Sequence, residues 1–289
     1  MRHRRHINGW GLILGTLCAV LATAALGHAS ERVTEDFHKT YPLAAQGRVS
    51  LENINGEVKI MVWDQNEVKV DAVKRGYSQN ALKSAQIEVE SGNDSIEIRT
   101  EYDRHDHTFW NDSRDDSASV DYTLTIPRNA SLDKIELVNG PLTIDGVAGE
   151  VRASCVNGPV TVRNLSGRTK LSTVNSRLDA QFDKLAGSSI ELEAVNGALV
   201  VTLPSDAQAD IEASTVSGHI SNDFGIRVRD HHYVGHDLHA QLGNGGARIN
   251  LENVNGRIEI RHANDNHPVS QVKDLNGGGE RASDDDDMD

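Results

Sequence analysis

The stretch IELVNGPLTI (residues 135–144) decides the fold, because it returns as ASCVNGPVTV (residues 153–162) eighteen residues further along. Both copies place apolar residues at every second position on either side of an Asn-Gly pair. That alternation is the period of a β-strand with one buried face, and Asn-Gly is typical of a tight turn. Each copy therefore predicts two short strands joined at a corner.

The motif recurs along the chain as a β-branched residue followed by Asn-Gly or a close variant. Its central copies are 18 to 21 residues apart, and the last interval, of 38 residues, is close to two periods. We expect an insertion to hide one copy there. A pair of short strands cannot bury its apolar side alone, so neighbouring copies must stack. The asparagines at the corners are Asn55, Asn139, Asn157, Asn175, Asn196 and Asn255.

These repeats predict an all-β chain, a parallel β-solenoid of 18–21-residue Asn-Gly rungs, where a rung is one two-strand repeat. Asn and Gly tolerate the left-handed backbone of a tight corner, so we interpret the asparagines as structural turns. Stacked in register, they would also form a ladder of side-chain amides. A row of ligand-binding amides is the functional alternative. Cys155 falls in an inward column and is expected to be buried and inert.

The N-terminus is typical of a secretory signal peptide over residues 1–29. Three arginines within the first five residues precede an uncharged apolar run from Trp10 to Leu26, and Gly27-His28-Ala29 offers a cleavage site. We expect cleavage after Ala29, an exported mature protein in the periplasm or at the cell surface, and no membrane span afterwards. An uncleaved anchor is the alternative, although the run is shorter than the ~20 residues that a span needs.

The remaining chain divides into three parts. Residues 30–127 predict a smaller β-rich module with alternating strands and one short helix over residues 78–84, capped by Ser78. Residues 128–262 predict the solenoid. From residue 263 to 289, Gly, Asn and Asp dominate and four consecutive aspartates stand near the end, so this tail is expected to be disordered.

Charge excludes several classes of partner. The chain carries a formal net charge of −14, and removal of residues 1–29 takes away three arginines and no acid, which leaves −17. Nucleic acids and anionic lipid surfaces require clustered cations, so neither is an expected partner. Aromatic residues make up 4% of the chain, which argues against a large stacking groove for bases or sugars.

Together these motifs resemble the adhesin-like β-repeat family of bacterial envelope proteins known as DUF4097. The resemblance rests on residues 49–56 running into 60–64, on Tyr122 to Arg128, and on the Asn-Gly rungs up to Ile260, and it covers about residues 37–262. It implies an exported solenoid with no established activity. It brings no catalytic residues that could be transferred to this chain.

Two segments have candidate chemistry. His232, His236 and His239 would lie on one face of a helix, and their imidazoles suit zinc or copper. Gly235 disfavours that helix, so a polar insertion loop is the alternative. Phe109 and Trp110 stand among charged residues between two predicted strands and are candidates for contact with a partner. A long hairpin loop is the other interpretation of that segment.

These observations favour a non-enzymatic, exported cell-envelope protein, an adhesin-like scaffold that binds an unidentified macromolecule, either a protein or a glycan. We expect no cofactor. A periplasmic structural or envelope-stress accessory protein is the first alternative. A carbohydrate-active β-helix enzyme is the second, and it would need acidic and basic side chains converging on one outward face. Outward positions such as Thr143, Thr161 and Ser221 form no such cluster.

Overall fold

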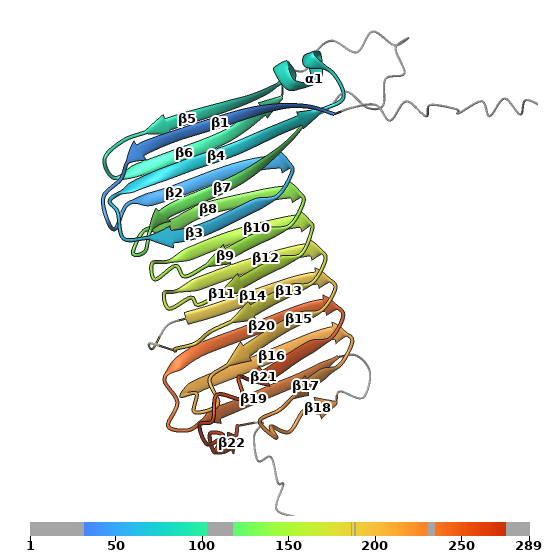
Figure 1. Ribbon diagram of the computed structural model, residues 1–289. Coiled ribbons are helices and arrows are strands. Elements are labelled where there is room, and N and C mark those ends of the chain that lie inside the picture. Colours follow the sequence, from blue (N-terminus) through green and yellow to red (C-terminus); the bar gives the residue numbers. More distant parts are fainter. Residues whose placement is uncertain (1–31, 103–117, 186, 188, 231–234, 276–289) are drawn as a thin grey trace, which may run out of the picture. The chain divides into compact units, whose positions relative to one another are not determined.

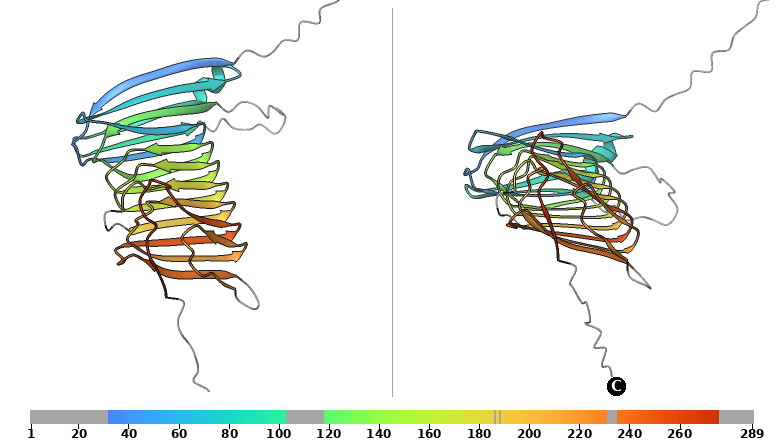
Figure 2. Two further views of the ribbon diagram at one scale, coloured as in Figure 1. Left: turned by 60° about the horizontal axis from the view of Figure 1, so that its bottom comes forward. Right: turned by 90° about the horizontal axis from the view of Figure 1, so that it is seen from below.

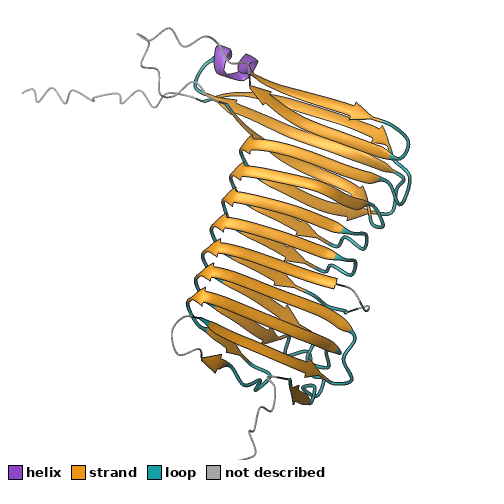
Figure 3. Ribbon diagram, turned by 180° about the vertical axis from the view of Figure 1, so that it is seen from behind, coloured by secondary structure: helices purple, strands orange, loops and turns teal. Residues whose placement is uncertain are grey.

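Strands dominate the protein. The computed structural model describes residues 32–102, 118–185, 187, 189–230 and 235–275, all within one compact unit, Arg32–Asp289. In those ranges the strands lie one above another and one short helix accompanies them (Figures 1 and 3). The prediction of an all-β fold is confirmed.

The strands form two sheets that face each other across one continuous hydrophobic core (Figure 2). In spatial order, sheet A contains β1 (Val33–Pro42), β4 (Glu67–Gly76), β7 (Ser119–Pro127), β3 (Val58–Trp63), β9 (Leu142–Asp145), β11 (Val160–Arg163), β13 (Leu178–Gln181), β15 (Leu199–Leu203), β21 (Ile258–His262) and β17 (Ile220–Asn222). Sheet B contains β18 (Arg229–Asp230), β19 (His236–Leu242), β16 (Ala209–Ser217), β20 (Ala247–Asn255), β14 (Ser189–Asn196), β12 (Thr169–Asn175), β10 (Val151–Asn157), β8 (Ser131–Asn139), β2 (Arg48–Asn55), β6 (Ser95–Tyr102) and β5 (Ala85–Ser91), and β22 (Val272–Asp274) pairs with β19.

Consecutive strand pairs build the middle of both sheets. In β8–β9, β10–β11, β12–β13 and β14–β15, the first strand lies in sheet B and the second in sheet A. Neighbouring pairs run parallel, with Ser154 opposite Ser172 and Val160 opposite Leu178. The alternation in the sequence turns one side of each strand into this core, where Leu171 and Leu192 are fully buried. Each such side chain stabilises the fold by about 1.5–3 kcal/mol.

Glycine is required where the corners stack. A Cβ atom on Gly140 would lie 2.1 Å from the carbonyl oxygen of Gly56, and Gly140 has a φ of +137°. The corner asparagines are not among the described residues with positive φ, which apart from glycines are Asn164, Asn264 and Asn266. The expectation that Asn shares the left-handed backbone of these corners is therefore wrong, because the following glycine has the positive φ at every corner except that of Asn175, which Ser176 follows without a positive φ.

Two strand pairs are stacked out of chain order. The pair β20–β21 lies between β14–β15 and β16–β17, although it is the last of the three in the chain. Likewise, β2–β3 lies between β8–β9 and the strands β6 and β7. The 38-residue interval therefore hides no additional rung, contrary to our expectation. It contains β18 and β19 instead, and β19 runs antiparallel along β16.

The helix α1 (Gln79–Ser84) begins where the sequence predicts it. Ser78 Oγ accepts a hydrogen bond from the Ala81 N–H at 3.0 Å, which is the expected N-cap. The predicted module boundary at Pro127 coincides with the end of β7. Both sheets continue across it, since β2 pairs with β8 and β3 with β9. Residues on both sides of Pro127 thus share one core.

The segment 263–275 is ordered, so the predicted start of disorder at residue 263 is wrong for these thirteen residues. Here β22 pairs with β19, and Ser270 donates from its N–H to the Ser205 carbonyl at 2.8 Å. Ser270 Oγ also donates to the Ala207 carbonyl at 2.7 Å. Short polar side chains and backbone groups anchor this segment, and an argument from apolar content overlooks such anchors. Residues 276–289 lie outside the described residues.

The predicted signal peptide, residues 1–29, also lies outside the described residues and stays a prediction. In the part of the chain that the structure describes, no helix combines the length and the apolar character that crossing a bilayer requires.

Candidate functional site

The corner asparagines form one continuous ladder of side-chain hydrogen bonds. Each Nδ2 donates to the Oδ1 of the neighbouring corner, and the last step joins residues 59 positions apart in the chain. The donor–acceptor distances are 2.8 Å for Asn139 to Asn55, 2.9 Å for Asn157 to Asn139, 2.9 Å for Asn175 to Asn157, 3.1 Å for Asn196 to Asn175 and 3.0 Å for Asn255 to Asn196. An amide has two N–H groups and two lone pairs, so each keeps capacity to bind water or a ligand.

Beside the ladder runs a strip of exposed apolar side chains, which we name the corner ridge. Its members are the residues that directly precede each corner, and they account for seven of the ten large exposed hydrophobic residues in the described ranges. They are Ile54, Val138, Val156, Val174, Val195, Val254 and Val216, with exposed fractions between 37% and 54%. Apolar residues concentrated in one place mark a surface suited to contact with another molecule.

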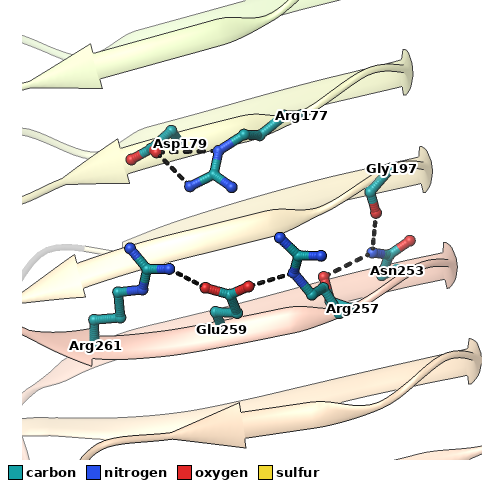
Figure 4. A network of polar contacts seen from close by, with 7 residues as sticks. All are labelled: Arg177, Asp179, Gly197, Asn253, Arg257, Glu259 and Arg261. Carbon is teal, nitrogen blue, oxygen red and sulfur yellow. Dashed lines mark hydrogen bonds and ion pairs between the residues drawn. The ribbon is translucent and has the colours of Figure 1, made fainter.

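Behind the ladder, inward side chains bind the corners of adjacent rungs. Asn53 Nδ2 donates to the Val120 carbonyl at 2.8 Å. Asn253 Nδ2 donates to the Gly197 carbonyl at 2.9 Å, which Figure 4 shows. Cys155 occupies the equivalent position, and its Sγ lies 3.4 Å from the Gly140 carbonyl oxygen. Burial raises the pKa of this thiol to about 11. Cys155 is buried, as predicted, and its raised pKa disfavours the reactive thiolate.

The outer face of sheet B has one shallow hollow of ≈ 250 Å³ over β8, β10 and β12. Its rim includes Lys134, Arg152 and Lys170, and each of these cations pairs with two carboxylates. Lys170 Nζ, for example, lies 2.7 Å from Glu191 and 3.1 Å from Glu193. The hollow is smaller than the ~300–1,000 Å³ of ordinary small-molecule sites, and its cations are already neutralised.

The outer face of sheet A has an arginine-rich network (Figure 4). Arg177 contacts Asp179 at 2.8 Å, and Arg257 and Arg261 both donate to Glu259. Burial raises the pKa of Glu259, but the hydrogen bonds from the two arginines outweigh it and lower the pKa overall. Val200 lies in register between Asp179 and Glu259 and is fully buried although it faces outward. Arginine stems commonly shield apolar surface, so this arrangement fits a structural role for the network.

One group of potential metal ligands occurs in the described ranges. The ligand atoms of Asp206, Asp265 and His267 all lie within 4.8 Å of one another. A hydrogen bond from Ser205 lowers the pKa of Asp265 well below its ordinary value, and the N–H of His267 contributes. Carboxylate oxygens with an imidazole nitrogen suit a transition-metal ion. Sequence reasoning missed this group, since it joins the loop after β15 to the segment after β21 and no local spacing reveals it.

The predicted histidine site is only partly described. His236 and His239 lie in strand β19, so the expected helix is wrong for this part of the segment. Three residues apart in a strand, their side chains point to opposite faces and do not share one side. His232 lies outside the described residues, and so do Phe109 and Trp110. The metal site and the aromatic contact loop therefore stay predictions.

A family model described as Toastrack DUF4097 matches residues 35–261 of the chain. No curated protein matches the chain. Among solved structures, a "putative cell adhesion protein" from Clostridium sporogenes ATCC 15579 is 13% identical with a TM-score of 0.45, and the match covers 79% of this chain and 100% of that one. A "putative adhesin" from Bacteroides fragilis NCTC 9343 is also 13% identical, with a TM-score of 0.32 and coverage of 79% and 97%. A "putative lipid binding protein" from Parabacteroides distasonis ATCC 8503 is 10% identical, with a TM-score of 0.24 and coverage of 79% and 96%.

Proposed function

The chain belongs to the Toastrack DUF4097 family, and from this premise we propose that it is a non-enzymatic, exported scaffold of the cell envelope that binds another macromolecule. Its strand pairs act as the Asn-Gly rungs of a parallel β-solenoid. Export is supported by the charged and apolar pattern of residues 1–29. The partner is a protein or glycan of the envelope.

The observation that carries the proposal is the corner ridge beside the ladder. The ridge runs across the rungs from Ile54 to Val216, and the ladder runs beside it from Asn55 to Asn255. Together they offer a long contact line of apolar and amide groups in place of a deep pocket. Amides hydrogen-bond but do not ionise near neutral pH, so they are not general acids or bases, and the cations at the hollow on sheet B are paired. This chemistry favours recognition of a large partner over catalysis.

The charge of the chain further limits the class of partner. A net charge of −14 repels polyanions, so nucleic acid and anionic lipid surfaces are disfavoured. Phe109 and Trp110 would add aromatic anchors, which commonly dominate the binding energy of protein interfaces. A periplasmic accessory role remains the alternative, and it differs from surface display in location and not in the surface used.

Binding of the purified protein to isolated envelope fractions of the producing bacterium tests this proposal. We expect saturable binding, with an affinity that falls at least about tenfold in the double variant Phe109→Ser/Trp110→Ser, or in the double variant Val156→Thr/Val174→Thr on the corner ridge. The matched control is Met61→Thr, which removes an exposed apolar side chain away from the ridge and should bind as the unmodified protein does. Absence of saturable binding to every fraction, or equal loss in the control, would contradict the proposal.

A further inference from the structure

The C-terminal strand pair β20–β21 separates two pairs that are consecutive in the chain. In sheet B, Glu193 of β14 lies opposite Glu252 of β20, which in turn lies opposite Ser214 of β16. In sheet A, β21 pairs with β15 on one side and with β17 on the other. Strands that follow one another in the chain usually become neighbours, so this arrangement needs a physical explanation.

The two separated pairs fit each other in register. Through β20, Ile190 aligns with Ile211, and Leu192 aligns with Ala213. All four of these side chains are buried in the core. Without β20–β21 the same inward columns would continue directly from β14 to β16, one strand spacing closer.

Backbone and side-chain hydrogen bonds hold the separated arrangement in place. The segment 263–275, which we name the strap, binds both the loop between β15 and β16 and the strand β19. The contacts are Ala263 N–H to Leu203 O at 2.9 Å, Ser205 N–H to Asp265 Oδ2 at 3.2 Å, Ser270 N–H to Ser205 O at 2.8 Å, Gly243 N–H to Gln271 O at 2.8 Å and Leu275 N–H to His239 O at 2.9 Å.

A buried asparagine distinguishes the pairs stacked out of chain order. LENVNG (251–256) of β20 nearly repeats LENING (51–56) of β2, and both pairs are inserted between elements that are remote in the chain. Asn53 and Asn253 bind carbonyls of their new neighbours, whereas the pairs in chain order have Leu137, Cys155, Thr173 and Ala194 at this position. The Nδ2 group of each buried asparagine finds a carbonyl partner across the stack, while its Oδ1 atom has none, so these two positions need a neighbouring corner beside them.

We propose that β16–β17 first stacks directly on β14–β15 and that β20–β21 then inserts between them, with the strap locking the result. The chain therefore has two stackings at this junction, and the C-terminal segment decides between them. Loop closure favours this order in the full chain, because β16 begins shortly after β15 ends, whereas β20 begins only at Ala247. Release of the strap would return the junction to the direct stacking.

Pulse oxidation during refolding of the full chain tests the proposal with one shared cysteine, Glu193→Cys. Adjacent parallel strands are about 4.8 Å apart, so next-nearest strands are about 9.6 Å apart, beyond the ~7 Å Cα separation that a disulfide spans. Glu193→Cys/Ser214→Cys joins next-nearest strands in the folded protein and should cross-link only early in refolding. Glu193→Cys/Glu252→Cys should cross-link only late.

Glu193→Cys/Ser172→Cys is the matched control, because β12 and β14 belong to consecutive strand pairs and are adjacent in sheet B. It should cross-link early and remain so in the folded protein. Adding Ser270→Ala and Asp265→Ala, which weaken the strap, should raise the Glu193–Ser214 cross-link in the folded state at least about threefold. The proposal is overturned if the Glu193–Ser214 pair never cross-links above background, or if the Glu193–Glu252 pair appears as early as the control.

Discussion

Asn157→Ala should lower the free energy of unfolding by about 1–2 kcal/mol. The Asn157 side chain donates to Asn139 at 2.9 Å and accepts from Asn175 at 2.9 Å, so the change removes two hydrogen bonds. Each contributes about 0.5–1.5 kcal/mol net, and exposure to water places both in the lower half of that range. The core is untouched, because the Asn157 side chain is exposed.

Urea unfolding followed by circular dichroism measures this loss, and Asn255→Ala is the matched control. Asn255 ends the ladder and donates one ladder bond, to Asn196 at 3.0 Å. It shares the corner position and the following glycine with Asn157, so differences in backbone propensity cancel. Asn255→Ala should therefore cost about half as much, ~0.5–1 kcal/mol, with an unchanged dependence on urea concentration.

Equal losses in the two variants would refute the reasoning, because the ladder would then contribute nothing beyond the local preference for asparagine at a corner. A loss below about 0.3 kcal/mol for Asn157→Ala would also refute it, since two hydrogen bonds cannot contribute so little if they persist in solution.

Four further predictions follow from the same structure. Gly158→Ala should lower the free energy of unfolding in urea by at least about 3 kcal/mol, because its Cβ would lie 1.9 Å from the Gly140 carbonyl oxygen. Gly225→Ala is the control: it has open space around it and a φ of +76°, so it should lower that free energy by only about 1–2 kcal/mol. The Cys155 thiol should resist a thiol reagent at about pH 8 until the protein unfolds. Its raised pKa stabilises the folded state below about pH 8.5, and this contribution to the free energy of unfolding should disappear as the pH rises towards about 11. The lowered pKa of Asp265 stabilises the fold above the ordinary aspartate pKa of about 3.9 and ceases to do so as the pH falls further, so Asp265→Asn should flatten the acid side of the stability profile. If the predicted histidine site holds zinc, stoichiometric metal on desalted protein should disappear in His232→Ala/His236→Ala, and a metal-free unmodified protein would end that hypothesis.

The strand columns and corners could be predicted from the sequence because burial imposes a strict period of two. The corner asparagines stand at the positions that the repeat assigns, and their side chains lie close enough to bond one another. Periodicity also identifies Leu171 and Leu192 as core residues, and both are fully buried.

The order of stacking could not be predicted in the same way. All rungs share the same inward pattern, so period and register allow β20–β21 to lie beside several neighbours. The contacts between the stacked pairs are single hydrogen bonds, such as that from Asn253 to the Gly197 carbonyl, which joins residues 56 positions apart. Sequence spacing does not reveal such a pair.

The candidate site illustrates the same limit. The group formed by Asp206, Asp265 and His267 depends on the strap reaching the loop after β15, and composition alone predicted that the strap would be disordered. The corner ridge, in contrast, is visible in the sequence as a β-branched residue before each corner. Its exposure follows once the neighbouring columns are assigned to the core.

Localisation of the protein in a diderm host tests the central claim most directly. The proposal of an exported envelope scaffold predicts a mature N-terminus at Ser30 and recovery outside the cytoplasm. Degradation by protease on intact cells would indicate surface display, and protection with release on osmotic shock would indicate the periplasmic alternative. Recovery in the cytoplasm with residues 1–29 still attached would contradict export and, with it, the proposed function.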